Sequence, residues 1–171
     1  MSYEEWLALP EQPKTEWVDG WAVIYMAPPG FDHSDAQAGL PYLFRRDLRR
    51  LYTGTEPDIR LPGNRIRRPD FAGWEARPDD YPITSVPLVV AEVLSPGTRS
   101  EDLLRKGPEY AAAGVAQYWV VDPESRTLEV SHLVDGAWQR LALFDATRPS
   151  GEVAIGDLGV VHVDLGDVFS D

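Results

Sequence analysis

Three side chains near the middle of the chain have types and spacing suited to chemistry. Asp70 closes the block RRPD, Glu92 is the one charge in the apolar run VPLVVAEVL, and Lys106 follows in the segment SEDLLRK. Carboxylate oxygens bind hard divalent cations, and a bound cation activates water and neutralises charge that develops on phosphate. A nearby lysine can steady the nucleophile or the phosphate. The three residues therefore indicate metal-assisted hydrolysis of a phosphodiester.

Glu92 is the most informative of the three. A lone carboxylate in a buried strand faces the interior or a cleft, where an unpaired charge costs several kcal/mol. A partner arginine would explain Glu92 alone, whereas a shared metal ion would explain both Glu92 and Asp70. Two carboxylates about 4 Å apart repel by about 4 kcal/mol at an effective dielectric constant near 20, and a divalent cation would reverse that repulsion. Taken alone, Asp70 could simply end a strand.

Lys106 stands out because the chain is otherwise rich in arginine. Of 16 basic residues, only Lys14 and Lys106 are lysine. Lysine has a movable pKa, so arginine cannot replace it in a proton-coupled role. The alternative interpretation is a surface pair between Asp102 and Lys106, one helical turn apart, which is worth about 0.3–0.5 kcal/mol.

Three further residues have less distinctive positions. His33 precedes a predicted helix and could cap it, contact phosphate or bind metal; a cap or surface role is favoured. Glu16 lies beside a predicted hairpin, either as a surface or cross-strand charge or as a group that reaches the metal site. Tyr110 falls on the same helical face as Lys106 and is expected in the core.

The charge of the chain is unevenly distributed. The net charge of −12 argues against indiscriminate nucleic-acid binding, because neutralisation of phosphates dominates such affinity. Residues 45–68 nevertheless carry eight arginines against three acids, a net charge of +5 (8 − 3), and lead directly into Asp70. This segment is either a solvated helix face or a surface that approaches phosphate. The predicted phosphate-contacting residues are Arg45, Arg46, Arg49, Arg50, Arg67 and Arg68.

Two strands are expected to deliver the carboxylates. Residues 86–94 are almost continuously apolar, as in a strand buried on both faces, and this strand would carry Glu92. Residues 58–74 predict two further strands, the second ending near Asp70.

A helix would carry Lys106. Thr98 or Ser100 can cap this helix, Gly107-Pro108 is expected to interrupt it, and Gly114 to end it.

An earlier helix is predicted over residues 34–52, with apolar residues on one stripe. Asp32 or Ser34 can cap it, and Pro41 either kinks it or marks its first turn.

The remaining segments predict strands and hairpins. Asp19-Gly20 and Asp135-Gly136 are turn signals for hairpins over residues 15–26 and 127–144, and residues 117–122 form another buried strand. The order of elements predicts an α/β fold, in which helices flank a mixed central β-sheet and antiparallel hairpins follow at the C-terminal end.

Composition limits the class of protein. A chain of 171 residues is expected to form a single domain over residues 1–171. The absence of cysteine excludes disulfides and thiolate metal sites. No apolar run approaches the length of about 20 residues that spans a membrane, and the acidic N-terminus lacks the pattern of a signal peptide. We therefore expect a cytoplasmic protein.

Several blocks together, covering nearly the whole chain, resemble a known family. They are TEWVDGWAV, the histidine before a helix, RRPDFAGW, LVVAEVLSPGT, the helix with Asp102, Lys106 and Tyr110, AGVAQYWVVDP and the closing LGDVF. In this order they resemble the Uma-two family of bacterial endonucleases, in the PD-(D/E)XK superfamily with the restriction endonuclease-like fold.

The resemblance implies an endonuclease that acts on DNA with Mg²⁺ or Mn²⁺, and a possible homodimer. It implies that Asp70 and Glu92 bind the metal together with the backbone carbonyl of Val93. The superfamily places its lysine two residues after the second acid, where this chain has Leu94. The resemblance implies that Lys106 supplies the amine instead.

Two other functions remain open. The first is a catalytically inactive nuclease-fold module that binds nucleic acid or a protein partner, which the net charge of −12 and Leu94 favour. The second is a phosphohydrolase of small nucleotides, which would turn over mononucleotides and leave polymers intact.

Overall fold

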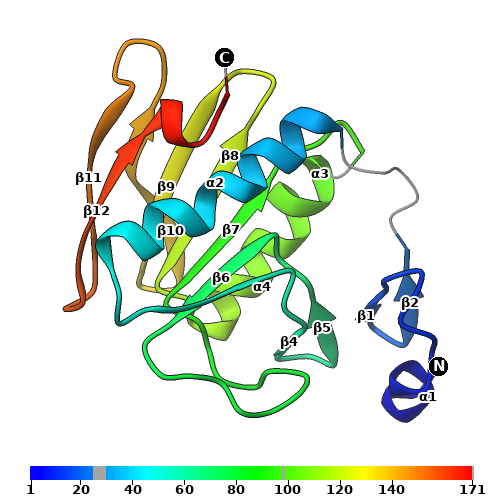
Figure 1. Cartoon of the computed structure of the whole chain (residues 1–171). Helices are drawn as coiled ribbons and strands as arrows, with labels where there is room; N and C mark the ends of the chain where they lie inside the picture. The colour runs from blue at the N-terminus through cyan, green and yellow to red at the C-terminus, as the bar shows by residue number, and fades with distance from the viewer. Residues whose placement is uncertain (25–29, 98, 171) are drawn as a thin grey trace.

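A six-stranded mixed sheet is the centre of the computed structural model, which describes residues 1–24, 30–97 and 99–170. The strand order is β10-β9-β8-β7-β6-β3; β7 and β8 are parallel and the other neighbouring pairs antiparallel (Figure 1). The strands are β3 (Tyr52–Thr55), β6 (Phe71–Trp74), β7 (Val89–Val93), β8 (Gln117–Asp122), β9 (Thr127–Val134) and β10 (Ala137–Phe144).

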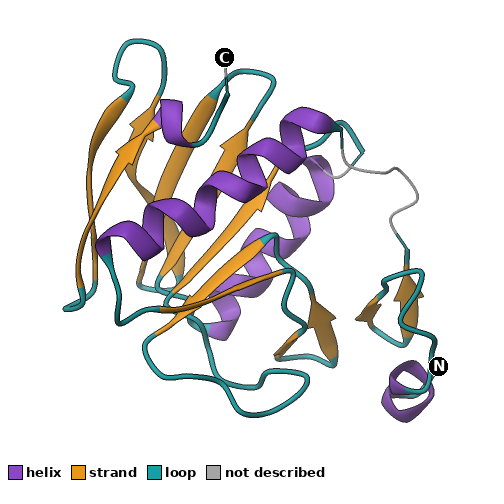
Figure 2. Cartoon of the chain, viewed as in Figure 1, coloured by secondary structure: helices purple, strands orange, loops and turns teal. Residues whose placement is uncertain are grey.

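Helices cover the two faces of this sheet (Figure 2). Helix α2 (Phe31–Asp47) lies on one face. The other carries a continuous helical run made of α3 (Arg99–Glu101), the π-helical segment η1 (Asp102–Lys106) and α4 (Gly107–Ala113). The predicted α/β architecture with a mixed central sheet is therefore confirmed.

The side chains of β7 alternate between two apolar cores, as the period of two in a strand requires. Val89, Ala91 and Val93 pack in the core that contains the buried face of α2. Val90 packs in the second core with Tyr110 of α4. Glu92 follows the same alternation and lies on the α4 side, so the helical run that carries Lys106 covers it.

A second sheet joins the N-terminal segment to the chain just before Asp70. Its order is β2-β1-β5-β4, and all its pairs are antiparallel. Trp17 of β1 stands opposite Ile66 of β5, and both pack with Trp6 in a small third core. The elements are α1 (Tyr3–Leu7), β1 (Glu16–Val18), β2 (Trp21–Val23), β4 (Ile59–Leu61) and β5 (Arg65–Arg67).

The C-terminal part is antiparallel, as predicted. β11 (Ser150–Ile155) and β12 (Gly159–Asp164) form a separate two-stranded sheet, and the short helix η2 (Leu165–Asp167) follows. No helix within the described ranges is long and apolar enough to cross a membrane.

Both predicted hairpin turns are confirmed. Asp19 and Gly20 have φ angles of 50° and 86°, and Asp135 and Gly136 have 49° and 78°. Such left-handed conformations suit glycine and tolerate aspartate. Gly114 likewise ends α4 in the left-handed region, with φ of 84°.

Some predicted boundaries are wrong. The strand before Asp70 ends at Arg67, and a new strand begins at Phe71. The first long helix spans Phe31–Asp47 and not residues 34–52. Its N-cap is Gly30, without a side-chain cap, and Pro41 lies inside it.

The helical run before β8 also differs from the prediction. It passes through Gly107-Pro108 without interruption: the Gly107 N–H bonds to the Asp102 carbonyl across the π-helical segment, and Pro108 follows in the first turn of α4. Ser100 lies inside α3 and does not cap it. The alternative cap, Thr98, lies outside the described residues.

Candidate active site

Asp70 and Glu92 meet where β6 begins and β7 ends. β6 and β7 are antiparallel, and Phe71 stands opposite Ala91, so the register brings the next pair, Asp70 and Glu92, side by side. Asp70 Oδ2 accepts a hydrogen bond from the N–H of Val93 at 2.7 Å. The two carboxylates and the backbone of Val93 therefore lie together at one end of the strand pair.

Glu92 is buried, with 1% of its surface exposed. Its Oε1 accepts a hydrogen bond from the Tyr110 hydroxyl at 2.6 Å and lies 3.2 Å from Lys106 Nζ. Burial raises the pKa of Glu92 well above its ordinary value, although the charge of Lys106 opposes this; the charges of Asp102 and Asp70 raise it further. The partners of this carboxylate are thus a lysine and a tyrosine, and no arginine pairs with it among the described residues.

Lys106 lies in the interior and is only 5% exposed. Its Nζ is 3.1 Å from Asp102 Oδ1, 3.2 Å from Glu92 Oε1 and 3.4 Å from Glu16 Oε1. The predicted pair with Asp102 therefore exists, but it is a buried contact and not a surface one. The helical run is π-helical at this point, a local widening that often occurs at functional sites.

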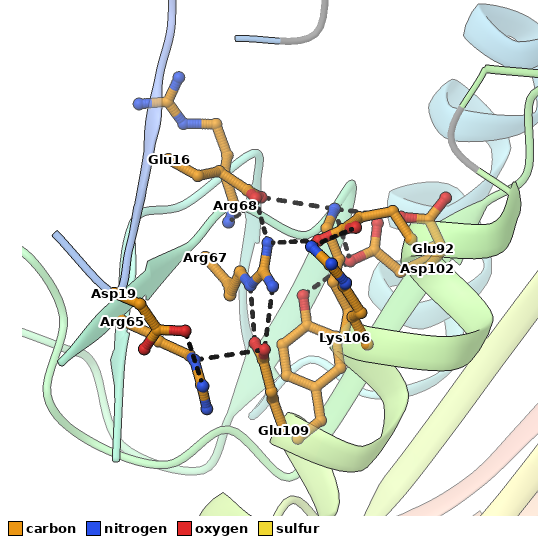
Figure 3. Close-up of polar contacts among 12 residues, drawn as sticks. Glu16, Asp19, Arg65, Arg67, Arg68, Glu92, Asp102, Lys106 and Glu109 are labelled. Carbon is orange, nitrogen blue, oxygen red and sulfur yellow. Dashed lines mark hydrogen bonds and ion pairs between the residues drawn. The ribbon is translucent and has the colours of Figure 1, made fainter. Parts of the chain in front are cut away.

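Glu16 also reaches this site, and the interpretation as a surface charge is wrong. It is 3% exposed. Its Oε2 accepts a hydrogen bond from Arg67 Nη1 at 2.8 Å, and its Oε1 accepts one from the N–H of Arg68 at 2.9 Å (Figure 3). Burial opposes ionisation of Glu16, but the charges of Lys106 and Arg67 outweigh it, so its pKa is lowered.

The prediction that Arg67 contacts phosphate is wrong, because its side chain is wholly buried. Besides Glu16, it pairs with Glu101 at 3.0 Å and donates two hydrogen bonds to Glu109, at 2.6 and 2.9 Å. Arg68 likewise donates two hydrogen bonds to the Asp58 carboxylate, at 2.8 and 2.9 Å. Arg67 is thus neutralised by acids that are distant in the sequence, and Arg68 by an acid of the same segment.

The structure does not bring the other four predicted arginines to Asp70 and Glu92. Arg45 and Arg46 occupy the last turn of α2, where cations complement the helix dipole. At 1.5 Å per residue, Arg45 lies about 18 Å along the helix from His33. Arg49 and Arg50 follow the helix and are exposed. For all four arginines, contact with phosphate stays a prediction.

His33 lies in the first turn of α2 beside Asp70, so the prediction that it caps the helix is wrong. Its Nε2 is 3.5 Å from Asp70 Oδ2. Burial lowers the pKa of His33, but the hydrogen bond to Asp70 and its charge raise it more, and the net shift is upward. Its buried Nδ1 has no hydrogen-bond partner within the described part of the chain.

The donor atoms at this site suit a hard cation. Among the described residues, no three histidine, cysteine, aspartate or glutamate side chains are grouped so that they could hold a metal ion. Mg²⁺, however, keeps several waters and commonly binds proteins through one or two carboxylates. Asp70, Glu92 and the Val93 carbonyl offer oxygen ligands, which fits Mg²⁺ or Mn²⁺ and does not fit a softer metal.

Comparison with known structures identifies the fold. A crystal structure described as that of "a putative nuclease belonging to DUF820 from Anabaena variabilis ATCC 29413" matches with a TM-score of 0.78 and 21% sequence identity, over 99% of this chain and 98% of that chain. The chain therefore has the fold of that protein.

The family follows from the sequence. The model of the Uma2 family, described as "Putative restriction endonuclease", matches residues 2–160, so the chain belongs to this family, as the sequence blocks indicated. No curated protein gives a significant match.

Proposed function

We propose that the chain is a metal-dependent endonuclease that hydrolyses phosphodiester bonds in DNA. The observation that carries this function is the meeting of Asp70, Glu92 and Lys106, which come from a loop, a strand and a helix, at one end of β6 and β7. Membership of a nuclease family supports the same chemistry. The single domain, the cytoplasmic location and the homodimer stay predictions.

In this function Asp70, Glu92 and the Val93 carbonyl hold Mg²⁺ or Mn²⁺. When bound, the ion supplies an activated water and neutralises charge on the phosphate. The hydrogen bond from the Val93 N–H fixes the Asp70 carboxylate at 2.7 Å, so one ligand is oriented by the backbone of another. The Lys106 ammonium and the Tyr110 hydroxyl orient the Glu92 carboxylate, because both contact its Oε1.

Lys106 serves as the amine of the site. Leu94, which occupies the usual superfamily position, is a buried apolar residue. Lys106 Nζ lies 3.2 Å from Glu92, so the ammonium is close enough to donate a hydrogen bond to water or phosphate oxygen at the same carboxylate.

If cleavage fails while DNA binds, an inactive binding module is the better description. Turnover of mononucleotides alone would instead indicate a phosphohydrolase.

The first test is nicking of supercoiled plasmid by the wild type with Mg²⁺ or Mn²⁺. We expect nicked product with either ion and none after chelation by EDTA. The absence of nicking with both ions, for a protein that is folded by circular dichroism, would contradict this function.

Metal binding is tested separately by thermal unfolding of Asp70→Asn. At 100 times its dissociation constant, Mn²⁺ should stabilise the wild type by about 2.7 kcal/mol. Asp70→Asn should lose this gain, because the amide removes one anionic ligand. Asp79→Asn, in an exposed loop, is the matched control and should respond like the wild type. Equal responses of Asp70→Asn and the wild type would show that the ion binds elsewhere.

Arg49 and Arg50 are the exposed arginines best suited to test the DNA-binding surface. The double change Arg49→Gln with Arg50→Gln should weaken DNA binding, and it should flatten the salt dependence by about 0.9 in slope for each lost phosphate contact. Arg140→Gln with Arg148→Gln removes the same charge from exposed positions elsewhere. A slope that changes equally in both double variants would reflect net charge and not a local contact.

A further inference from the structure

Glu16 lies far from the other site residues in sequence but contacts one of them directly. It belongs to β1 of the N-terminal hairpin, and its Oε1 is 3.4 Å from Lys106 Nζ. Both side chains are almost fully buried. The N-terminal hairpin therefore contributes a charged group to the site that the nuclease function requires.

Glu16 is held in place from two directions. β1 pairs with β5 through Trp17 opposite Ile66, which brings Glu16 next to Arg67 in the antiparallel register. The Arg67 side chain then binds Oε2 at 2.8 Å, and the Arg68 N–H binds Oε1 at 2.9 Å. Each carboxylate oxygen thus accepts a hydrogen bond from the last residue of β5 or from the residue that follows it.

Arg67 is in turn fixed by α4. Glu109 accepts two hydrogen bonds from the guanidinium, and a forked contact of this kind sets the orientation of the arginine. Figure 3 shows Glu16 above the guanidinium and Glu109 below it. A chain of contacts therefore runs from Glu109 through Arg67 and Glu16 to Lys106.

We propose that Glu16 is a positioning residue that holds the Lys106 ammonium in place at the reacting end of the site. Lysine has a flexible four-carbon stem, so its amine needs anchors to occupy one place. Asp102 anchors it from its own helix and Glu92 from β7. Glu92 is also a proposed metal ligand, so Glu16 supplies an anchor from a separate sheet that does not depend on the ion. The catalytic part of this inference rests on the proposed function of Lys106.

The chain offers a selective spectroscopic probe, because Lys14 and Lys106 are its only lysines. In protein labelled with [¹³C]lysine and carrying Lys14→Arg, the single Cε signal belongs to Lys106. A fixed side chain gives two distinct Hε resonances, whereas a mobile one averages them. We expect two resonances when Glu16 is present, and averaging towards one in Glu16→Gln.

Nuclease kinetics give the second readout. Glu16→Gln should lower kcat by about 10- to 100-fold, the range found when outer partners of site groups are removed, with KM and Mn²⁺ affinity within about twofold of the wild type. Asp19→Asn is the matched control, because it removes one carboxylate from the same N-terminal hairpin, where Asp19 pairs with Arg65 and lies outside the contacts that lead to Lys106. It should leave kcat and the Lys106 resonances nearly unchanged.

Three results would overturn the inference. They are Lys106 resonances that stay distinct in Glu16→Gln, a kcat that is unchanged in this variant, and equal losses in Glu16→Gln and Asp19→Asn, which would mean that the hairpin supports the fold in general. If Glu16→Gln does not fold, Glu16→Asp replaces it, is compared with Asp19→Asn and is read by the same spectrum. If the wild type does not cleave DNA, the proposed function fails, while the Hε resonances still decide whether Glu16 fixes Lys106.

Discussion

Lys106→Ala should reduce plasmid nicking in Mn²⁺ by about 10²- to 10⁴-fold, the usual contribution of a positioned proton-transfer group. Its affinity for Mn²⁺ should fall much less than the nicking rate, because the amine acts on water or phosphate and affects the ion only through the ligand Glu92. Nicking rates and Mn²⁺ titrations of the two proteins measure both quantities. Nicking that continues undiminished in Lys106→Ala would contradict the assignment of the amine to this helix.

Lys106→Arg separates the charge of Lys106 from its chemistry. Removal of the ammonium leaves Glu16, Glu92 and Asp102 without a cation they contact at 3.1–3.4 Å, so Lys106→Ala also loses stability. Lys106→Arg keeps a cation among them, but a guanidinium does not share its proton near neutral pH. We expect it to be folded and nearly inactive. If Lys106→Arg nicks as fast as the wild type, charge alone is sufficient.

Part of the site was predictable because its signals are local. Glu92 is one charge in an apolar strand, and such a residue needs a partner wherever the strand lies. The rarity of lysine drew attention to Lys106, and the two Asp-Gly turns carry their own conformational preference. The predictions for Glu92 and the turns depend on neighbours within a few residues, and the prediction for Lys106 depends on the composition of the chain.

The rest depends on pairing between distant segments. Nothing near Glu16 in sequence indicates that β1 pairs with β5, and this pairing alone brings Glu16 next to Arg67 and Lys106. Arg65 and Arg67 suggested a positive surface for the same reason: their carboxylate partners, Glu109 among them, lie in other elements. Net charge along a segment cannot distinguish a buried, paired arginine from an exposed one.

Arg67→Met should lower the free energy of unfolding by about 3–5 kcal/mol, the usual cost of removing one member of a buried ion pair. The change would leave Glu16, Glu101 and Glu109 without the guanidinium that contacts all three. Urea unfolding of the variant and the wild type gives the difference. Arg140→Met is the control, because Arg140 is exposed and its pair with Glu129 is worth about 0–1 kcal/mol.

The cost should come from the carboxylates that Arg67→Met leaves behind, more than from lost packing. Adding Glu109→Met to Arg67→Met should therefore cost less than the sum of the two single changes, since the second change removes a carboxylate that has already lost the hydrogen bonds from the guanidinium. Residues in direct contact commonly show coupling of about 0.5–3 kcal/mol in such a cycle. Strict additivity in urea unfolding would mean that the guanidinium stabilises the fold through its size alone. A loss of unfolding free energy no larger than that of Arg140→Met would contradict the role of Arg67 as the cation that these acids share.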